Sequence, residues 1–349
     1  MGFLSTFVSF FQEKHKYWSK QPVSRDHNEE GIISNLIPFP LRIKQPNQLV
    51  KVDPDNKSFH NVLANFLSIH YVKGYVFNEN DISWYLSHPY LNGDNILNLK
   101  NENMLIANIV AKPYKLCLKN NIINTHYVDL LTVHKDHRSK NYAPLVISHT
   151  AKESSNKYSK VFIFKIEQKR LPFNHICKMK FYSYATNTTL SPNNSHVLKH
   201  STSTDMVYIK QLYNTSCSGY KCYPIFDEYQ SKYIHSSKPG VYESLIIMEN
   251  GIRKGVLTYV VNDMMNYKYR VMEIVLLLYE GTDYTDLFKQ INKHCHAKKI
   301  NRILCLNIGE NNNFIKKFDF EPGLDTYLYM YNYHINGTLT PSDILFNFI

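Results

Sequence analysis

The stretch from Val128 to Ile147, VDLLTVHKDHRSKNYAPLVI, decides the fold that this sequence predicts. It overlaps the apolar run YVDLLTVH at 127–134, which predicts a strand. A basic turn follows, and Pro144 then stands in the first turn of a predicted helix, where proline is favoured. A second buried strand, VFIFKI, is predicted at 161–166. The order strand, turn, helix and strand is a βαβ unit, and its turn directs a helix N-terminus at a ligand.

The second half of the sequence repeats this plan. A hairpin turned at Asn250-Gly251 is predicted over 244–261, and it matches the strands around the turn near Asn120-Asn121 in the first half. The rest of the second unit is a strand at 272–279, a helix from Asp283 to His296 and a strand at 302–308. We therefore expect an α/β (α+β) fold in which two halves related by pseudo-twofold symmetry share a mixed sheet.

Polar, turn-rich sequence at 186–204 suggests an exposed segment near the junction of the halves. We place the boundary there, giving an N-terminal half, 1–195, and a C-terminal half, 196–349. Helical spacing of apolar residues also predicts helices at 58–72 and from Glu79 to His88, whereas 12–50 shows no period and is expected to be extended.

Composition excludes several classes of protein. Of the 349 residues, 44% are hydrophobic and 20% are charged, so the chain is globular rather than disordered. The net charge of +11 favours polyanionic partners, but it is spread along the chain without long basic blocks, which argues against nucleic acid. The six cysteines form no CxxC pair, so we expect free thiols in the reducing cytoplasm. We assign His294-Cys295-His296 to a solvated helix surface rather than to a metal site.

The N-terminus suggests two further possibilities. Residues 1–11, MGFLSTFVSFF, place apolar side chains on one helical face but are too short to span a membrane and lack a signal-peptide pattern. We expect this face to dock on the protein itself, with peripheral membrane contact as the alternative. Gly2 and Thr6 match the loose pattern of a myristoyl acceptor, although the bulky Phe3 argues against acylation of Gly2.

The basic turn carries the clearest chemistry. Arg138, Ser139 and Lys140 lie between a strand end and a helix start. Consecutive backbone N–H groups and two fixed cations at that place suit a pyrophosphate. A solvated surface turn is the alternative.

The segment resembles the acyl-CoA-binding signature of the glycylpeptide N-tetradecanoyltransferases, or N-myristoyltransferases, whose pattern is close to NFLCVHKKLRSKRVAPVLI. Upstream, His15-Lys16-Tyr17-Trp18 with Gln21-Pro22-Val23 resembles KFWxTQPV, and FNENDISWYL at 77–86 resembles FDYSPEFLLWAL. The order of elements from Met248 to Asn332 also follows the family, so the similarity extends from about Lys14 onward.

The resemblance implies a fold, a co-substrate and a binding site. The family has two fused acetyltransferase-like (GNAT) halves, of which the N-terminal one binds myristoyl-CoA and the C-terminal one forms much of the peptide groove. It implies a monomer that uses myristoyl-CoA as co-substrate, has no prosthetic group, and acts on peptides with an N-terminal glycine. The positions implied to contact CoA are Tyr17, Trp18, Val133, Arg138, Ser139, Lys140, Asn141, Tyr142, Ala143 and Pro144.

The resemblance also implies the catalytic groups. Backbone amides of Leu130 and Leu131 would stabilise the oxyanion as the glycine amine attacks the thioester. The base would be the terminal carboxylate at Ile349, at the end of the apolar tail DILFNFI; the alternative is a tail that only seals the core. No His, Asp or Glu in the matched motifs is an evident base.

Several positions depart from the family. Asn141 replaces an arginine, Ile166 a threonine, Tyr182 a histidine and Asn307 an aspartate. Lys73-Gly74-Tyr75 replaces an acidic loop, which predicts a preference against basic residues near the peptide start. We expect myristoyl transfer, and the alternative is a divergent acyl-CoA- or lipopeptide-binding protein with weak or no catalysis.

Overall fold

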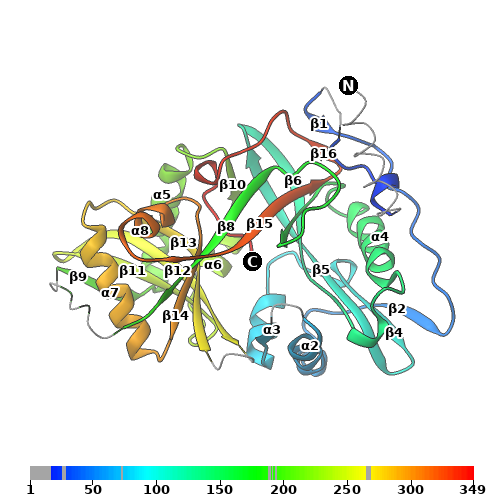
Figure 1. Cartoon of the computed structure of the whole chain (residues 1–349), viewed down its shortest axis with the longest axis horizontal. Coiled ribbons are helices and arrows are strands. Elements are labelled where there is room, and N and C mark those ends of the chain that lie inside the picture. The colour runs from blue at the N-terminus through cyan, green and yellow to red at the C-terminus, as the bar shows by residue number, and fades with distance from the viewer. Residues whose placement is uncertain are drawn as a thin grey trace.

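The computed structural model describes residues 17–25, 29–71, 74–187, 190, 192, 195–264 and 269–349. Within this part of the chain, one 14-stranded mixed sheet runs through the molecule, and helices pack on it (Figure 1). A separate two-stranded sheet pairs β1 (Gly31–Ile32) with β16 (Tyr333–His334). The expected mixed α/β fold is confirmed.

The elements follow the predicted order. The strands of the first half are β2 (Asn47–Lys51), β3 (Tyr75–Val76), β4 (Ile96–Asn101), β5 (Met104–Leu118), β6 (Asn121–Val133), β7 (Phe162–Glu167) and β8 (Cys177–Ala185). Those of the second are β9 (His196–His200), β10 (Cys222–Ile225), β11 (Tyr242–Glu249), β12 (Ile252–Met264), β13 (Tyr269–Tyr279), β14 (Arg302–Leu306) and β15 (Glu321–Tyr331). The α-helices are α2 (Lys57–His70), α3 (Glu79–Leu86), α4 (Tyr142–Ser155), α5 (Met206–Cys217), α6 (Glu228–His235), α7 (Tyr284–Ala297) and α8 (Asn311–Lys317).

Both predicted βαβ units are present. Strands β6 and β7, which precede and follow α4 along the chain, pair in parallel. Strands β13 and β14, which precede and follow α7, do the same. Helix α4 buries Leu145 and Val146 in one apolar cluster, whereas α7 buries Leu287, Phe288 and Ile291 in another. The repeated unit explains the duplication that the sequence suggested.

One surface assignment was wrong. Cys295, which we expected on a solvated helix face, is fully buried in the cluster under α7 because it continues the apolar stripe of that helix. His294 is half-buried, and its Nε2 lies 2.7 Å from the hydroxyl of Tyr259, while His296 is exposed. All six cysteines are buried free thiols.

The two halves exchange strands in the middle of the sheet. Strand β8 of the first half pairs with β14 of the second, β15 of the second pairs with β7 of the first, and β8 and β15 pair with each other (Figure 1). The sheet is therefore continuous between the two halves. The boundary at 195/196 stays a prediction. The segment 186–204 was expected to be exposed turns, but its residues His196–His200 form edge strand β9, because they pair with β11.

A β-bulge interrupts β6 just before the basic turn. Asp129 lies opposite Val110 and Thr132 opposite Asn108, so Leu130 and Leu131 together face one residue of β5. Leu130 has a positive φ of 51°. Bulges of this kind redirect side chains and backbone groups, often beside active sites.

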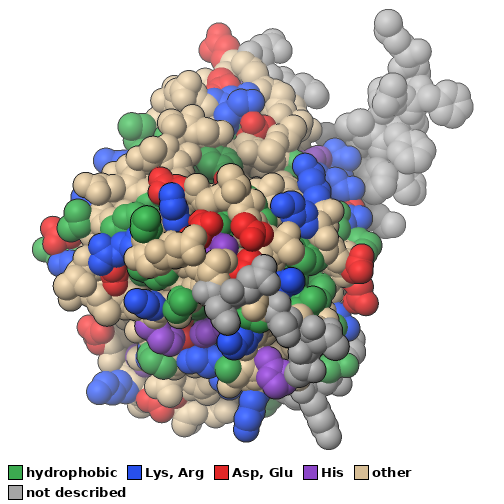
Figure 2. All heavy atoms as spheres, turned by 90° about the vertical axis from the view of Figure 1, so that its left-hand side faces the viewer, with side chains coloured by type: hydrophobic (Ala, Val, Ile, Leu, Met, Phe, Trp, Pro, Cys, Tyr) green, Lys and Arg blue, Asp and Glu red, His purple; other side chains and the backbone are tan. Residues whose placement is uncertain are grey.

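The surface charge is mixed on the side that carries α7. Figure 2 shows basic and acidic side chains interspersed over this face. On this face, therefore, the net positive charge of the chain is not gathered into a single patch. No helix within the described residues is both long and apolar enough to cross a membrane.

Candidate active site

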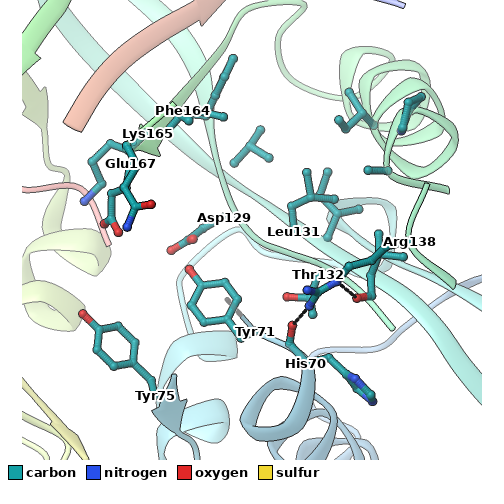
Figure 3. Close-up of a pocket in the computed structure, with 18 of the residues that line it drawn as sticks. His70, Tyr71, Tyr75, Asp129, Leu131, Thr132, Arg138, Phe164, Lys165 and Glu167 are labelled. Carbon is teal, nitrogen blue, oxygen red and sulfur yellow. Dashed lines mark hydrogen bonds between the residues drawn. The ribbon is translucent and has the colours of Figure 1, made fainter. Parts of the chain in front are cut away.

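Two cavities meet at the bulge of β6. The larger has a volume of about 950 Å³ and extends to the basic turn, whereas the smaller has about 90 Å³ and reaches the last residues of the chain. The residues that line both are Tyr71, Tyr75, Asp129 and Lys165. Figure 3 shows Asp129, Tyr71, Lys165 and Glu167 pointing into the same part of the larger cavity.

The turn at one end of the larger cavity is shaped for an anion. Ser139 and Asn141 both adopt left-handed backbone conformations, with φ of 64° and 63°. Asn141 is the N-cap of α4, and its side chain forms no capping bond with any residue that the structure describes. The first turn of a helix leaves N–H groups without intrahelical partners, and these groups together with the helix dipole attract phosphate.

Arg138 supplies a fixed cation at this end. Its Nη2 donates to the carbonyl of His70 at 2.6 Å and its Nε donates to the carbonyl of Val133 at 3.3 Å, yet the side chain remains exposed (Figure 3). These bonds orient the guanidinium beside the turn before any ligand arrives. Lys140 is also exposed but is not part of the cavity wall.

The neighbouring histidine His70 adds no charge at neutral pH. Burial, and then the positive charges of His134, Lys135 and Arg138, lower the pKa of His70 to about 4. Its Nδ1 accepts a hydrogen bond from the backbone N–H of Lys135 at 3.3 Å. The permanent positive charge at the turn therefore comes from arginine and lysine.

The rest of the larger cavity is mostly apolar. The ring of Trp18 stacks on Phe164 with centroids 6.2 Å apart, and aliphatic and aromatic side chains of α4 and β7 continue the wall. Tyr17 packs edge-on against Trp18, with 5.1 Å between ring centroids, but does not line the cavity, and burial raises its pKa. A cavity that is basic at one end and apolar beyond suits a phosphate-bearing thioester with a long acyl chain.

The departures from the family pattern have different locations. Ile166 and Tyr182 line the larger cavity, so these two replacements change its wall. Asn307 lies away from it: its Oδ1 accepts the N–H of Lys180 at 2.7 Å and ties β14 to β8. Lys73 and residues 1–16, including Gly2, His15 and Lys16, lie outside the described residues.

The bulge contains both expected oxyanion donors. The N–H of Leu130 donates to Oδ1 of Asp129 at 2.8 Å, and the carbonyl of Leu130 accepts from Nδ2 of Asn108 at 3.0 Å. The other oxygen of Asp129, Oδ2, accepts from the hydroxyl of Tyr85 at 3.1 Å. Leu131 lines the larger cavity and Leu130 the smaller one. One expected donor is thus engaged by the carboxylate of the preceding residue.

The smaller cavity is closed by the tail of the chain. Phe348 is buried, and Ile349 lines this cavity with a main-chain oxygen that accepts from Nζ of Lys112 at 3.0 Å. Lys112 is itself buried, with its Nζ 3.1 Å from the ring centroid of Tyr85, and burial lowers its pKa well below the usual value. Burial favours the neutral amine of this lysine.

A further polar chain connects the tail to the sheet. Lys165 Nζ donates to Oδ1 of Asn347 at 2.6 Å, and Nδ2 of Asn347 donates to Oε1 of Glu273 at 3.0 Å. Glu273 lines the smaller cavity and is 6% exposed. Charged side chains therefore lie where the two cavities meet, among lining residues that are largely aromatic.

The structure brings most of the predicted residues together. Those that line the larger cavity are Trp18, Leu131, Val133, Arg138, Ser139, Asn141, Tyr142, Ala143 and Pro144. Leu130 and Ile349 line the smaller one, and Tyr17 and Lys140 line neither. Sequence reasoning missed Lys112, Asp129, Lys165 and Glu273, which are isolated charges within apolar strands. Among the described residues, no group of His, Cys, Asp and Glu is arranged to hold a metal ion.

Comparisons with known proteins agree with this geometry. Residues 28–164 match the family model described as myristoyl-CoA:protein N-myristoyltransferase, N-terminal domain. A glycylpeptide N-tetradecanoyltransferase of Mycosarcoma maydis is 27% identical over 161 residues, 40% of this chain; the match spans only 23% of the length of that relative.

Solved structures match over nearly the whole chain. Saccharomyces cerevisiae N-myristoyltransferase with bound myristoyl-CoA has a TM-score of 0.82 at 18% identity, covering 94% of this chain and 90% of that one. The same yeast enzyme with myristoyl-CoA and inhibitors gives 0.79 at 18% identity, covering 94% and 92%. Residues 28–164 thus resemble the N-terminal domain of the N-myristoyltransferase family, and 94% of the chain shares the fold of the yeast enzyme.

Proposed function

We propose that this protein transfers a myristoyl group from myristoyl-CoA to the N-terminal glycine amine of peptides. The observation that carries the proposal is the course of the larger cavity, from the open N-terminus of α4 through an apolar wall to the bulge at Leu130. Phosphates at the turn and an acyl chain along the wall would bring the thioester to the place where the second cavity begins. The yeast enzyme of the same fold holds myristoyl-CoA.

The reaction requires few side chains. The amine nitrogen attacks the thioester carbonyl carbon, and the N–H groups of Leu130 and Leu131 would stabilise the negative charge on its oxygen. The resemblance assigns the base to the carboxylate of a chain that ends at Ile349, which lies in the smaller cavity beside Lys112. The peptide amine would meet the thioester where that cavity joins the larger one.

The alternative is a binding protein with weak or no catalysis, which the comparisons do not favour. Because Asp129 already accepts the N–H of Leu130, the protein could bind acyl-CoA or a lipopeptide with weak or no turnover. The replacement of a family threonine by Ile166 in the cavity wall points the same way.

One assay separates the two functions. The protein is incubated with myristoyl-CoA and a panel of peptides that begin with glycine, and CoA release and peptide mass are followed together. Transfer predicts a mass gain on glycine peptides but none on matched peptides that begin with alanine or an acetylated glycine. Saturable binding of myristoyl-CoA without acylated peptide would favour the second function.

Acyl-chain selection tests the apolar wall. Each buried CH₂ contributes about 0.8 kcal/mol, so shortening the chain by two carbons should weaken binding roughly 15-fold. Calorimetry with dodecanoyl- and tetradecanoyl-CoA measures this ratio, with free CoA as the control. Equal affinities would contradict an acyl chain along this wall.

We also propose, from the sequence, that the protein is a cytoplasmic monomer. The segment considered for peripheral membrane contact lies outside the described residues, and vesicle flotation with and without residues 1–11 tests that contact. Light scattering of the purified protein tests the monomer.

A further inference from the structure

Asp129 stands where the two cavities join. Among the described residues that line both, it is the only carboxylate; the others are Tyr71, Tyr75 and Lys165. Ile349, by contrast, lines only the smaller cavity, and its main-chain oxygen is bound by Lys112. The family pattern quoted above has asparagine at this position, so the carboxylate is a feature of this chain.

The contact between Asp129 and Leu130 fixes the distances involved. Oδ1 of Asp129 lies 2.8 Å from the backbone nitrogen of Leu130. A thioester oxygen bound to the same N–H would lie about 2.9 Å from that nitrogen, in the space that Oδ1 now occupies. An amine in position to attack would lie about 3–3.5 Å from the carbonyl carbon, and therefore within reach of a displaced Asp129 carboxylate.

The surroundings favour a cation near Asp129. Tyr85 donates to its Oδ2, and two rings that line the smaller cavity already have amines near them: Lys112 Nζ is 3.1 Å from the ring centroid of Tyr85 and Lys165 Nζ is 5.9 Å from that of Tyr127. The ionisable groups around the junction are Tyr71, Tyr75, Asp81, Tyr85, Lys112, Tyr114, Tyr127, Lys165, Glu167, Glu273 and Ile349, whose carboxylate the resemblance assigns as base. Of the lysines, Lys112 is held by Ile349, and Lys165 by Asn347.

We propose that Asp129 is the base that takes the proton of the substrate's ammonium group, and that its movement frees the Leu130 N–H for the thioester oxygen. This inference rests on the proposed transfer function and assigns its base to a different group from Ile349. Arrival of the peptide would then complete the oxyanion site, so that the thioester of bound acyl-CoA is less reactive toward water until the amine is present.

The step balances as follows. The ammonium gives one proton to Asp129, and the nitrogen lone pair forms a bond to the thioester carbon while the carbonyl π pair moves to oxygen. Collapse of this oxyanion breaks the carbon–sulfur bond and releases the CoA thiolate. The thiolate takes the second proton from nitrogen, leaving the neutral amide and CoA thiol, and Asp129 returns its proton to solvent.

The test compares two carboxylates in the full-length protein. Asp129→Asn keeps the shape and an acceptor for the Leu130 N–H but takes no proton, so kcat should fall about 100-fold or more while the affinity for myristoyl-CoA stays within twofold. Asp319→Asn changes an exposed carboxylate that lines neither cavity in the same way and should lower kcat less than about twofold if base catalysis belongs to Asp129. Melting temperatures confirm that both variants fold.

Chemical rescue distinguishes a base from a residue that only supports the structure, because an added carboxylate can restore turnover only if a base is missing. Formate should restore part of the turnover of Asp129→Ala but not of Asp129→Asn, because only the alanine variant leaves space for the small carboxylate. Wild-type kcat in Asp129→Asn, equal losses in both carboxylate variants, or failure of formate in a folded Asp129→Ala would overturn the assignment. So would full activity of Asp129→Asn combined with loss of turnover when residues are appended to Ile349.

These outcomes also separate the two levels of the proposal. If the wild-type protein binds myristoyl-CoA and yields no acylated peptide, the transfer function fails, and the role of Asp129 fails with it. If the wild-type protein acylates peptides and Asp129→Asn does so equally well, only the assignment of the base is wrong.

Discussion

Helices α4 and α7 occupy the same place in the two βαβ units but begin in opposite ways. At α7 the N-cap Asp283 accepts hydrogen bonds from the backbone N–H groups of Thr285, at 3.1 Å, and Asp286, at 3.0 Å. At α4 the N-cap Asn141 is left-handed and its side chain makes no capping bond among the described residues. Thus one helix start is satisfied by its own carboxylate, and the other is left open.

A second carboxylate strengthens the contrast. Asp286 in the first turn of α7 is buried and accepts from Ser195 Oγ at 2.6 Å, and its Oδ2 lies 2.8 Å from Nδ1 of His196. These bonds hold edge strand β9 against the helix. The start of α4 instead faces the larger cavity with Arg138 beside it. We infer that one copy of a repeated unit keeps its helix start for stability and the other for an anionic ligand. Changes at α7 should therefore alter stability, and changes at α4 should alter CoA binding.

The largest expected effect is at Asp286. Replacing it by alanine leaves Ser195 Oγ and the buried Nδ1 of His196 without this carboxylate, and each hydrogen bond to a charged group contributes about 1.5–3 kcal/mol, so the two together contribute about 3–6 kcal/mol. The free energy of unfolding, measured in urea, should fall by that amount. CoA affinity of the folded variant should not change, and a parallel loss of CoA affinity would show that the two helix starts are not independent.

Arg138→Ala should lower the affinity for CoA while leaving the free energy of unfolding unchanged. Hydrogen bonds to charged groups contribute about 1.5–3 kcal/mol, so CoA and myristoyl-CoA should both bind roughly 10- to 150-fold more weakly. The loss should be smaller at high salt, because screening weakens the interaction with phosphate in the wild type. Calorimetry at two salt concentrations measures it, with Arg138→Lys as the variant that keeps the charge. Unchanged affinity would mean that the turn is only a solvated loop.

The βαβ units were predictable from sequence because they rest on local signals. Apolar runs, Pro144 in a first turn and Asn250-Gly251 in a hairpin each act within a few residues. Even the buried stripe that includes Cys295 follows from helical spacing, although the adjacent histidines obscured it.

The junction of the cavities was not predictable in the same way. Asp129 comes from β6, Lys165 from β7, Lys112 from β5 and Glu273 from β13, and no local pattern states that these strands converge. The bulge at Leu130 depends on the pairing register of β5 with β6, which is a property of the assembled sheet. A lone charge in an apolar strand was the only available signal for each residue.

Asp283→Ala tests the cap of α7 more gently than Asp286→Ala. Loss of an N-cap carboxylate costs about 0.5–2 kcal/mol of stability. Urea unfolding should show a decrease within this range, and Asp283→Asn, which can still accept the same bonds, should recover most of it. An equal loss in both variants would mean that the negative charge at the helix start, rather than the capping bond, stabilises α7.

The smallest expected effect is at Asn141, where the contrast between the helices is sharpest. Asn141→Asp places a carboxylate at the start of α4, as at α7, without a change in side-chain size. Both residues tolerate the left-handed backbone that the turn requires, so the fold should be kept. A charge at a helix terminus contributes about 0.3–1 kcal/mol, and here it would repel the phosphates, so CoA should bind roughly 2- to 5-fold more weakly at low salt.

Asn141→Arg is the control of opposite sign and should bind CoA more tightly. Calorimetry at low and high salt separates charge from shape, since both shifts should shrink together as salt rises. If the aspartate variant binds as tightly as the wild type while Arg138→Ala does not, the anion is held by the guanidinium alone and the open helix start contributes nothing.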